Sequence, residues 1–368
     1  MTGDPLLFRP LRVGRMNLQH RIAMAPLTRY RADASHVHHD LAVEYYAQRA
    51  CAPGTLLITE ATFIDPLAGG FTHAPGCYNV EQVEAWKRIV EEVHKKGSFV
   101  YLQLWALGRA ADPEVLRQES EGAEVVSASD IPFEGGAKPR PLSEREIQDY
   151  VSYYARAAEL FVNEAGGDGV EIHNANGYLL DQFLQTNSNQ RTDAYGGSVE
   201  NRARFPLEVA RAVVDAVGAD RVGVRISPFS SFQNMKMPTT KEIKDTSGYF
   251  VEELKKLEVA YLHSVEARFS EKGHAIVEAA EGENLDFIHD IWAPRPLLLA
   301  GGFTADTAHE TTERHSNVVV AFGRYFISNP DLVRRIKEDI PFAAYDRATF
   351  YTKGADKFEG YTDYPFAR

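Results

Sequence analysis

Eight short apolar runs recur along the chain, and stretches with helical periodicity lie between most of them. Each run has the length of a buried strand, and the helical stretches carry apolar residues on one face. The runs are Arg21–Leu27, Gly54–Ala61, Ser98–Trp105, Asp168–His173, Arg221–Ser227, Val259–Glu266, Pro296–Gly302 and Asn317–Arg324. Alternating strands and helices are typical of a parallel sheet covered by helices. Eight strands predict a closed (β/α)8 TIM barrel rather than an open sheet.

After the fourth strand, a helix carrying Leu179, Leu180 and Phe183 is predicted. We expect six further helices around this barrel. They span Val80–Lys96, Glu144–Ala165, Val199–Val217, Thr240–Leu257, Ala305–Thr312 and Pro330–Glu338. The second of them has the clearest boundaries. Ser143 and Glu146 have the spacing of a capping box at its start, and Gly166-Gly167 ends it.

Two segments lie outside the repeat of strands and helices. Leu11–Leu18, ahead of the first strand, is predicted to form a small N-terminal hairpin. Ala106–Leu142, after the third strand, is rich in Glu, Gly and Pro and is predicted to form a long excursion over the barrel mouth. Loops of this length are usually functional or disordered.

The composition fits one large globular unit. We expect residues 1–368 to form a single domain, because α/β barrels of this size are common and 44% of the residues are hydrophobic. The net charge of −12 argues against nonspecific binding to nucleic acid or to an anionic membrane. Two cysteines imply no disulfide framework. Neither a signal peptide nor a membrane-spanning run is recognisable, so we expect a cytoplasmic protein.

The stretch Asp168–Phe183 carries the clearest chemical signal. Alternation along its strand puts Glu171 and His173 on the face opposite the apolar residues, which is the lumen face if helices cover the other. The strand is followed within six residues by Asn176 and Tyr178, so an imidazole, an amide and a phenol converge at one strand end. Two of these groups can hydrogen-bond a substrate oxygen, and the third can deliver a proton. A strand-ending histidine before an Asn-Gly turn can also be purely structural, and the stretch alone leaves that open.

The same alternation places Arg225 on the lumen face of the fifth strand. A buried guanidinium is costly unless an anion or an acceptor meets it. Two explanations remain open. Arg225 either pairs with Glu171 on the neighbouring strand or faces an electron-rich ligand.

The last two strands end in glycines. Gly301 and Gly302 follow the seventh strand, and Gly323 with Arg324 follows the eighth. In a (β/α)8 barrel the loops after these two strands commonly hold a phosphate. Glycine lets backbone N–H groups approach the phosphate, and arginine can clamp it with two hydrogen bonds. A phosphorylated cofactor or substrate is therefore predicted.

These residues carry a family resemblance that covers the whole chain, from Leu7 to Pro365. The chain resembles the Old Yellow Enzyme family of FMN-dependent ene-reductases, and most of all its fungal and yeast members. The motifs that carry the resemblance are Met24–Tyr30, Ile58–Glu60, Leu102–Trp105, Glu171–Tyr178, Ser188–Arg202, Gly223–Ser227 and Phe322–Tyr325. The stretch Arg268–Asn284 is shorter and less patterned than in the yeast members.

The resemblance implies a tightly bound, non-covalent FMN and gives each of its contacts a residue. Pro26 and Thr28 would lie beside the flavin, with the Thr28 hydroxyl on its O4 atom, and Ala61 would offer backbone contacts near N5. Gln103 would bond the pyrimidine edge. Arg225 would lie where negative charge accumulates on reduction. The phosphate would be held by residues of the last two strands, namely Gly301, Gly302, Gly323 and Arg324.

The resemblance also implies the reaction. His173 and Asn176 would donate hydrogen bonds to the carbonyl oxygen of an α,β-unsaturated aldehyde or ketone. Hydride would pass from flavin N5 to the β carbon, and Tyr178 would protonate the α carbon. A phenol suits this role because it keeps its proton at neutral pH, with an ordinary pKa of about 10. The substrate pocket of the family is lined at positions that match Thr28, Trp105, Phe232 and Tyr351. The three aromatic residues among them could equally be core residues of the barrel mouth.

NADPH is the hydride donor that the resemblance implies, in a ping-pong cycle. No G-x-G-x-x-G fingerprint of a dinucleotide-binding domain is present, so NADPH would visit the flavin transiently. A homodimer is compatible with the resemblance, because the family contains monomers, dimers and larger forms. No metal is expected: the cluster from His36 to His39 is predicted to be solvated surface, and His94, His263 and His274 receive no role.

Three other functions are alternatives to an FMN-dependent ene-reductase. The first is a flavoenzyme of the same fold whose net reaction is isomerisation or reductive cyclisation in a fungal specialised pathway. It would be favoured by phenylalanine in place of the proton donor, and Tyr178 instead favours net reduction. The second is a phosphate-binding aldolase or isomerase, which would need a Schiff-base lysine or an acidic base at a strand end. The third is a non-catalytic flavin-binding or steroid-binding module.

Overall fold

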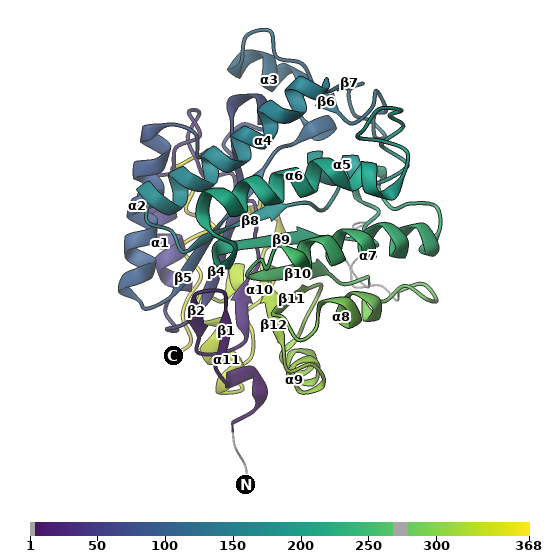
Figure 1. Cartoon of the computed structure of the whole chain (residues 1–368). Coiled ribbons are helices and arrows are strands. Elements are labelled where there is room, and N and C mark those ends of the chain that lie inside the picture. Colours follow the sequence, from purple (N-terminus) through teal and green to yellow (C-terminus); the bar gives the residue numbers. More distant parts are fainter. Residues whose placement is uncertain (1–3, 268–278) are drawn as a thin grey trace.

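The computed structural model describes residues 4–267 and 279–368 and contains a closed barrel of eight parallel strands (Figure 1). Each predicted apolar run overlaps one of these strands, so the predicted (β/α)8 barrel is confirmed. Around the barrel the order is β3 (Ile22–Met24), β4 (Leu56–Phe63), β5 (Phe99–Trp105), β8 (Gly169–His173), β9 (Val222–Ile226), β10 (Tyr261–Val265), β11 (Leu297–Ala300) and β12 (Val318–Phe322), which pairs with β3 again.

Helices surround the barrel on its outside (Figure 1). The six helices predicted around the barrel are present, with ends that differ from the prediction by a few residues. They are α2 (Val80–Lys95), α4 (Glu144–Glu159), α6 (Val199–Val217), α7 (Thr240–Lys256), α9 (Ala305–Arg314) and α11 (Leu332–Lys337). Short helices also follow two strands at the barrel mouth, the predicted α5 (Leu179–Leu184) after β8 and α10 (Arg324–Ser328) after β12.

Besides α10 and the short α3 (Pro113–Glu119), two helices were not predicted. They are α1 (Asp40–Arg49) between the first two barrel strands and α8 (Asp286–Trp292) before β11. The face that α1 buries contains Arg49 beside two tyrosines, so its apolar periodicity is weak. Arg49 is buried because its guanidinium donates to backbone carbonyls, among them those of Phe326 at 3.0 Å and Tyr361 at 3.2 Å.

The predicted capping box begins α4. The Ser143 hydroxyl accepts from the Glu146 backbone N–H, and the Glu146 carboxylate accepts from the Ser143 N–H at 2.8 Å. After Glu159 the chain continues as a π-helical turn, Leu160–Glu164, so the regular helix is shorter than predicted. Gly166 then adopts φ of +81°, a conformation that glycine takes without strain, and the chain turns toward β8.

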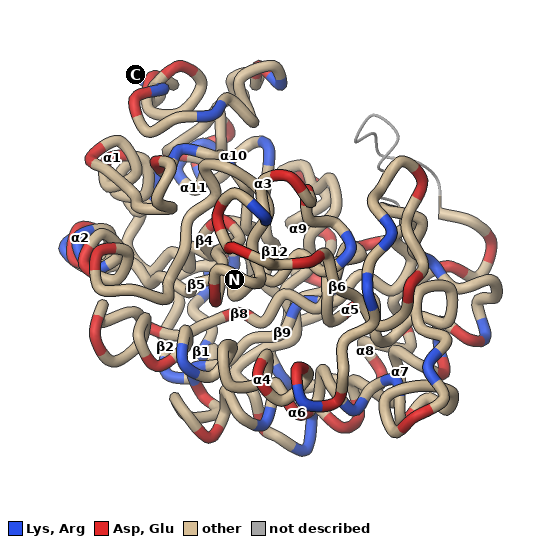
Figure 2. Tube along the Cα trace, turned by 90° about the horizontal axis from the view of Figure 1, so that it is seen from above, with Lys and Arg blue, Asp and Glu red and all other residues tan. Residues whose placement is uncertain are grey.

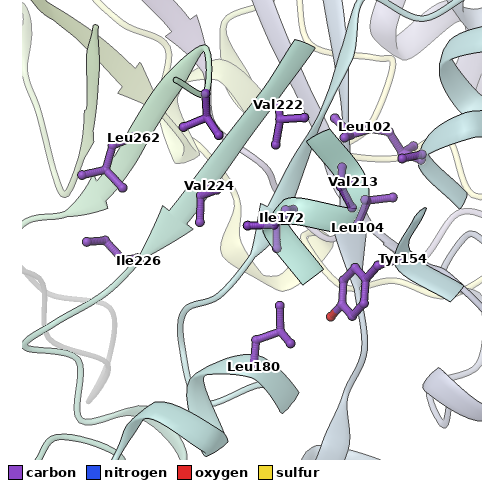
Figure 3. Packing of buried hydrophobic residues seen from close by; sticks show 14 of the residues in the cluster. Leu102, Leu104, Tyr154, Ile172, Leu180, Val213, Val222, Val224, Ile226 and Leu262 are labelled. Carbon is purple, nitrogen blue, oxygen red and sulfur yellow. The ribbon is translucent and has the colours of Figure 1, made fainter. Parts of the chain in front are cut away.

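The alternation that was read from the sequence sorts the barrel strands into two packing layers. Leu102, Ile172 and Val224 belong to the cluster between strands and helices, and Figure 3 shows this layer from close by, with Leu180 of α5 beneath it. The lower lumen forms a separate cluster. The predicted hairpin, β1 (Leu11–Val13) with β2 (Met16–Leu18), packs against it and closes the amino-terminal end of the barrel.

The predicted excursion after β5 is partly regular. It contains α3 (Pro113–Glu119) and a short parallel pair, β6 (Val126–Ser127) with β7 (Arg140–Pro141). Arg109 ties it to the segment after β9, since its guanidinium donates to the carbonyls of Ile131 at 3.1 Å and Gln233 at 2.8 Å. The excursion is therefore fastened at the barrel mouth.

The histidine cluster was predicted to be solvated surface, and this is wrong for two of its members. His36 and His38 are buried. The His36 Nδ1 lies 2.6 Å from the carbonyl oxygen of Ala74, and the His38 ring packs edge-on against Trp86. His38 lies against Trp86 and near Glu60, which come from segments distant in sequence. The local pattern around His38 could therefore not predict its burial. His274 lies outside the described residues, as does most of the stretch that departs from the yeast pattern.

Acidic and basic residues are interspersed along the outer helices in the view from above (Figure 2). In residues 4–267 and 279–368, no helix combines the length and the apolar character needed to cross a membrane. The same residues bring together no group of three or more His, Cys, Asp or Glu side chains able to hold a metal ion.

Candidate active site

A cavity of about 1130 Å³ lies at the carboxyl ends of the barrel strands. Sites of this fold lie at that face, because the loops that follow the strands meet there. Every site residue singled out in the sequence lines this cavity, from seven of the eight strands' ends and the C-terminal segment. These are Pro26, Thr28, Ala61, Gln103, Trp105, His173, Asn176, Tyr178, Arg225, Phe232, Gly301, Gly302, Gly323, Arg324 and Tyr351.

The turn after β8 is held in an unusual backbone conformation. Asn176 has φ of 56° and Gly177 has φ of 74°, both in the left-handed region. The Asn176 N–H donates to the Ser227 hydroxyl at 2.7 Å, and the Gly177 N–H donates to the Asp181 carboxylate at 2.8 Å. Asparagine and glycine are the residues that tolerate this region best. The Asn-Gly pair therefore gives the turn the shape that directs Asn176 and Tyr178 into the cavity.

Three rings face one another above the strand ends. The centroids of the His173 and Tyr178 rings are 5.0 Å apart, and those of Trp105 and Tyr178 are 4.9 Å apart, each pair in an edge-to-face arrangement. Trp105 stacks in turn on Phe63 at 5.2 Å. Contacts of this kind fix the orientation of the Tyr178 phenol.

His173 is a neutral imidazole. Burial, together with the charge of Arg225 and the neighbouring His263, holds the pKa of His173 well below its usual range. A neutral imidazole has one N–H donor and one acceptor. Its Nδ1 has no hydrogen-bond partner within the described parts of the chain. His173 can therefore donate a hydrogen bond to a ligand without acting as an acid.

Arg225 is half-buried on the lumen face of β9, which is the face that the alternation predicted. Its Nε has no hydrogen-bond partner among the residues that the structure describes. One of the two explanations was a direct ion pair between Arg225 and Glu171. The Glu171 carboxylate instead accepts hydrogen bonds from Gln103, Tyr261 and His263. Burial lowers the pKa of Arg225, and the charge of Glu171 opposes that shift from nearby.

The far end of the cavity combines glycines with a guanidinium. Gly301 and Gly302 have φ of 140° and 70°, and a Cβ on Gly301 would come within 2.7 Å of the Glu266 Cβ. Arg324 donates to the Tyr345 hydroxyl at 3.1 Å and lies over its ring. A glycine pair beside an oriented guanidinium is a combination suited to a phosphate, because glycine lets the backbone approach closely.

The cavity as a whole fits an FMN molecule. It has a phosphate cradle at one end, Gln103 and the unpartnered Arg225 Nε in its middle, and aromatic walls at the other end. Its volume exceeds the usual range for ligand sites, which leaves room for a substrate beside a tricyclic ring.

Several cavity residues were missed in the sequence. Phe133 and Glu134 of the excursion form part of the rim, and Tyr30 and Phe71 form an aromatic pair with ring centroids 6.3 Å apart. These residues lie in loops, where no periodicity reveals which way a side chain points. His263 received no role, although it alternates with Tyr261 on the lumen face of β10 and the period of two could have identified both.

The comparisons with known proteins agree with this geometry. The model of the NADH:flavin oxidoreductase / NADH oxidase family matches residues 6–342. Chanoclavine-I aldehyde reductase of Penicillium roqueforti is 51% identical over 366 residues, which cover 98% of this chain and 96% of that protein.

Solved structures show the same similarity. Old Yellow Enzyme from a Pichia species has a TM-score of 0.89 and 38% identity, covering 99% of this chain and 94% of that one. Morphinone reductase in complex with tetrahydroNAD has a TM-score of 0.88 and 38% identity, covering 99% and 98%. FMN and a nicotinamide are accordingly the cofactors that the family supports. The chain belongs to the NADH:flavin oxidoreductase / NADH oxidase family and is a flavin-dependent oxidoreductase of the Old Yellow Enzyme group.

Proposed function

We propose that the protein reduces the activated C=C bond of α,β-unsaturated aldehydes and ketones, with FMN as the bound cofactor and NADPH as the hydride donor. The observation that carries the proposal is the convergence of His173, Asn176 and Tyr178 on one wall of the cavity whose other walls suit FMN. The three residues supply two hydrogen-bond donors and one proton donor within a single turn of chain.

FMN would be held along the cavity by groups of matching chemistry. The phosphate would lie against Gly301, Gly302, Gly323 and Arg324. Pro26, Thr28 and Ala61 would contact the flavin near O4 and N5, and Gln103 and Arg225 would contact its pyrimidine edge. When bound, FMN supplies a hydride at N5 for transfer to the β carbon of the substrate.

The protein residues would carry out the remaining steps. His173 and Asn176 donate hydrogen bonds to the carbonyl oxygen and so stabilise the negative charge that develops there. Tyr178 gives its phenolic proton to the α carbon, and the phenolate then regains a proton from solvent. The β carbon gains the hydride and the α carbon gains the proton, so the C=C bond is reduced and the carbonyl is retained.

Trp105, Phe232 and Tyr351 would pack against the substrate. The cavity opens beside Tyr351, which is 49% exposed. NADPH and the substrate would use this opening in turn, which gives ping-pong kinetics. The aldehyde in the name of the Penicillium relative favours enals over enones as the first substrates to test.

The test begins with the purified protein. It should be yellow, and denaturation should release FMN. Anaerobic NADPH should bleach the bound flavin, and an enal such as cinnamaldehyde should restore the oxidised spectrum. Product analysis then separates the outcomes: a saturated aldehyde supports the proposal. An allylic alcohol, an isomerised enal, or a colourless protein that does not take up FMN would contradict it.

A further inference from the structure

We propose that Glu171 is a positioning residue for the flavin, which fixes the orientation of the Gln103 amide and offsets the charge of Arg225. This inference rests on the proposed placement of the pyrimidine edge of FMN beside Gln103 and Arg225. Glu171 belongs to β8, is fully buried and does not line the cavity itself. It acts through the residues that do.

The strand register brings the participating residues to two adjacent levels of the lumen. Glu171 pairs in register with Gln103 on one side and with Gly223 on the other. Arg225 lies one level closer to the mouth, in register with His173 and His263. Glu171 therefore lies directly beneath the part of the cavity that Gln103 and Arg225 line.

Both carboxylate oxygens of Glu171 are used. Oε1 accepts from the Gln103 Nε2 at 2.8 Å. Oε2 accepts from the Tyr261 hydroxyl at 3.0 Å and lies 2.8 Å from the His263 Nδ1. Gly223 makes the Tyr261 contact possible, since a Cβ there would come within 2.6 Å of the phenol oxygen.

The charge state of Glu171 follows from these contacts. Burial favours the neutral acid and so raises the pKa of Glu171. The interactions of the carboxylate with His263, Arg225 and Gln103 favour the ionised form more strongly, so this pKa lies below its ordinary value. Burial also lowers the pKa of His263. The network is thus a carboxylate held by neutral donors, with the nearby Arg225 as its cationic neighbour.

A carboxylate fixes the orientation of an amide. An ionised Glu171 only accepts hydrogen bonds, so the nitrogen of the Gln103 amide must face it and the oxygen must face away. Gln103 lines the cavity, so that oxygen is the group offered to a ligand. An acceptor at this position selects an N–H donor, and the imide N3–H of FMN is such a donor.

The charge of Glu171 has a second effect. Arg225 attracts the negative charge that reduced FMN carries, and a carboxylate beneath it weakens this attraction. Glu171 should therefore lower the affinity for reduced FMN relative to oxidised FMN. The orientation of the Gln103 amide should affect the binding of oxidised and reduced FMN equally. Variants can therefore separate this orientation effect from the charge effect.

Three variants and two measurements test the proposal on the holoenzyme. The midpoint potential of bound FMN is measured against a reference dye, and FMN dissociation is followed by its fluorescence. Glu171→Gln removes the charge and should favour reduced FMN roughly tenfold, a rise of about 30 mV for a two-electron couple. Glu171→Asp keeps the charge but withdraws it from Gln103. It should bind oxidised and reduced FMN about tenfold more weakly, with an unchanged potential.

Tyr261→Phe is the matched control. It removes one donor to Glu171 but leaves the charge and the Gln103 contact. The affinity for FMN, and the ratio of the affinities for reduced and oxidised FMN that sets the potential, should therefore stay within twofold of the parent. An unchanged or lowered potential in Glu171→Gln would overturn the charge effect, and parent-like FMN retention in Glu171→Asp would overturn the orientation effect. If Glu171→Gln does not hold FMN, the FMN affinity of Glu171→Asp decides whether Glu171 positions Gln103. A parent protein that binds no FMN would instead contradict the proposed function.

Discussion

The rings of His173 and Tyr178 are in edge-to-face contact on one wall of the cavity, with centroids 5.0 Å apart. If Tyr178 delivers the proton, its replacement by phenylalanine should separate the two half-reactions. Tyr178→Phe should be reduced by NADPH at the parent rate, while its reoxidation by an enal should slow by about 10²-fold or more. Stopped-flow absorbance of the flavin measures both. Parent-like reoxidation would show that another group supplies the proton.

His173 and Asn176 should act as hydrogen-bond donors of comparable weight. Removing either by substitution with alanine should slow reoxidation by an enal by about 10²-fold, because each bond strengthens as charge develops on the substrate oxygen. Since burial keeps the pKa of His173 far below its usual range, the imidazole stays neutral, and this rate should show no histidine titration between pH 6 and 8. A rate in the parent that falls with the ordinary titration of a histidine, and that becomes pH-independent in His173→Ala, would contradict this assignment.

At the residue scale, alternation along strands was the most informative signal in the sequence. It placed Arg225, Glu171 and His173 on the lumen face, and all three lie there. It could not show that Glu171 would bond Gln103, Tyr261 and His263, since such partners depend on register and on the space left by Gly223. Loop residues such as Glu134 carried no signal of this kind.

At the scale of single elements, α4 is the helix whose start was best specified. Ser143 caps it, and the Arg140 guanidinium binds both oxygens of the Glu146 carboxylate at 2.7 and 3.0 Å. Ser143→Ala should lower the free energy of unfolding by about 1 kcal/mol, because the Glu146 N–H loses its acceptor. Urea unfolding measures this change. Ser152→Ala, in the middle of the same helix, is the control and should cost nothing.

Helices with a regular apolar stripe were predictable, and helices without one were not. For α1, the burial of Arg49 depends on carbonyl groups of Phe326, Ile327 and Tyr361, which lie between 277 and 312 residues further along the chain. A local pattern cannot contain that information. The seven-residue α8 is too short for its periodicity to be distinguished from that of a loop.

At the scale of the whole molecule, the C-terminal segment is fastened back onto the loop that follows the first barrel strand. Arg31 donates to the carbonyls of Phe350 at 2.9 Å, Thr349 at 2.9 Å and Glu359 at 3.0 Å. These bonds hold Phe350 and Tyr351 at the cavity wall. The planar fork of arginine makes several such bonds at once, and the ammonium group of lysine cannot reproduce them.

Arg31→Lys should therefore loosen the segment from residue 347 to residue 360. We expect faster cleavage there by a protease and a KM for the enal raised several-fold, with reduction by NADPH less affected. Arg12→Lys is the control, since Arg12 is exposed and donates to the nearby carbonyl of Gly14 at 3.1 Å. Equal proteolysis of both variants would show that Arg31 does not hold the segment.

The stability of the molecule should also depend on pH through Glu60, which lies in β4 where its pairing with β5 is irregular, between Ile58 and Ala61. This carboxylate is fully buried. One oxygen accepts from the Arg29 N–H at 3.0 Å, and the other lies 3.5 Å from the His38 Nε2 without a hydrogen bond. Burial raises the pKa of Glu60 to about 7, from 4.5 in the unfolded chain. Between these values the folded state binds the proton more tightly, so this group lowers stability as pH rises from about 4.5 to about 7.

Buried histidines act in the opposite direction, because burial lowers the pKa of His20 to about 4 and that of His38 to about 3. Their contribution to stability is lost as pH falls below about 6.5, where the unfolded chain takes up protons first. A difference curve separates the two effects. The melting temperature of Glu60→Gln minus that of the parent should rise between pH 5 and pH 8, because only the parent must ionise a buried carboxylate. The same difference for Glu44→Gln, an exposed carboxylate on α1, should stay flat. A flat curve for Glu60→Gln as well would mean that the Glu60 carboxylate is not desolvated in the folded protein.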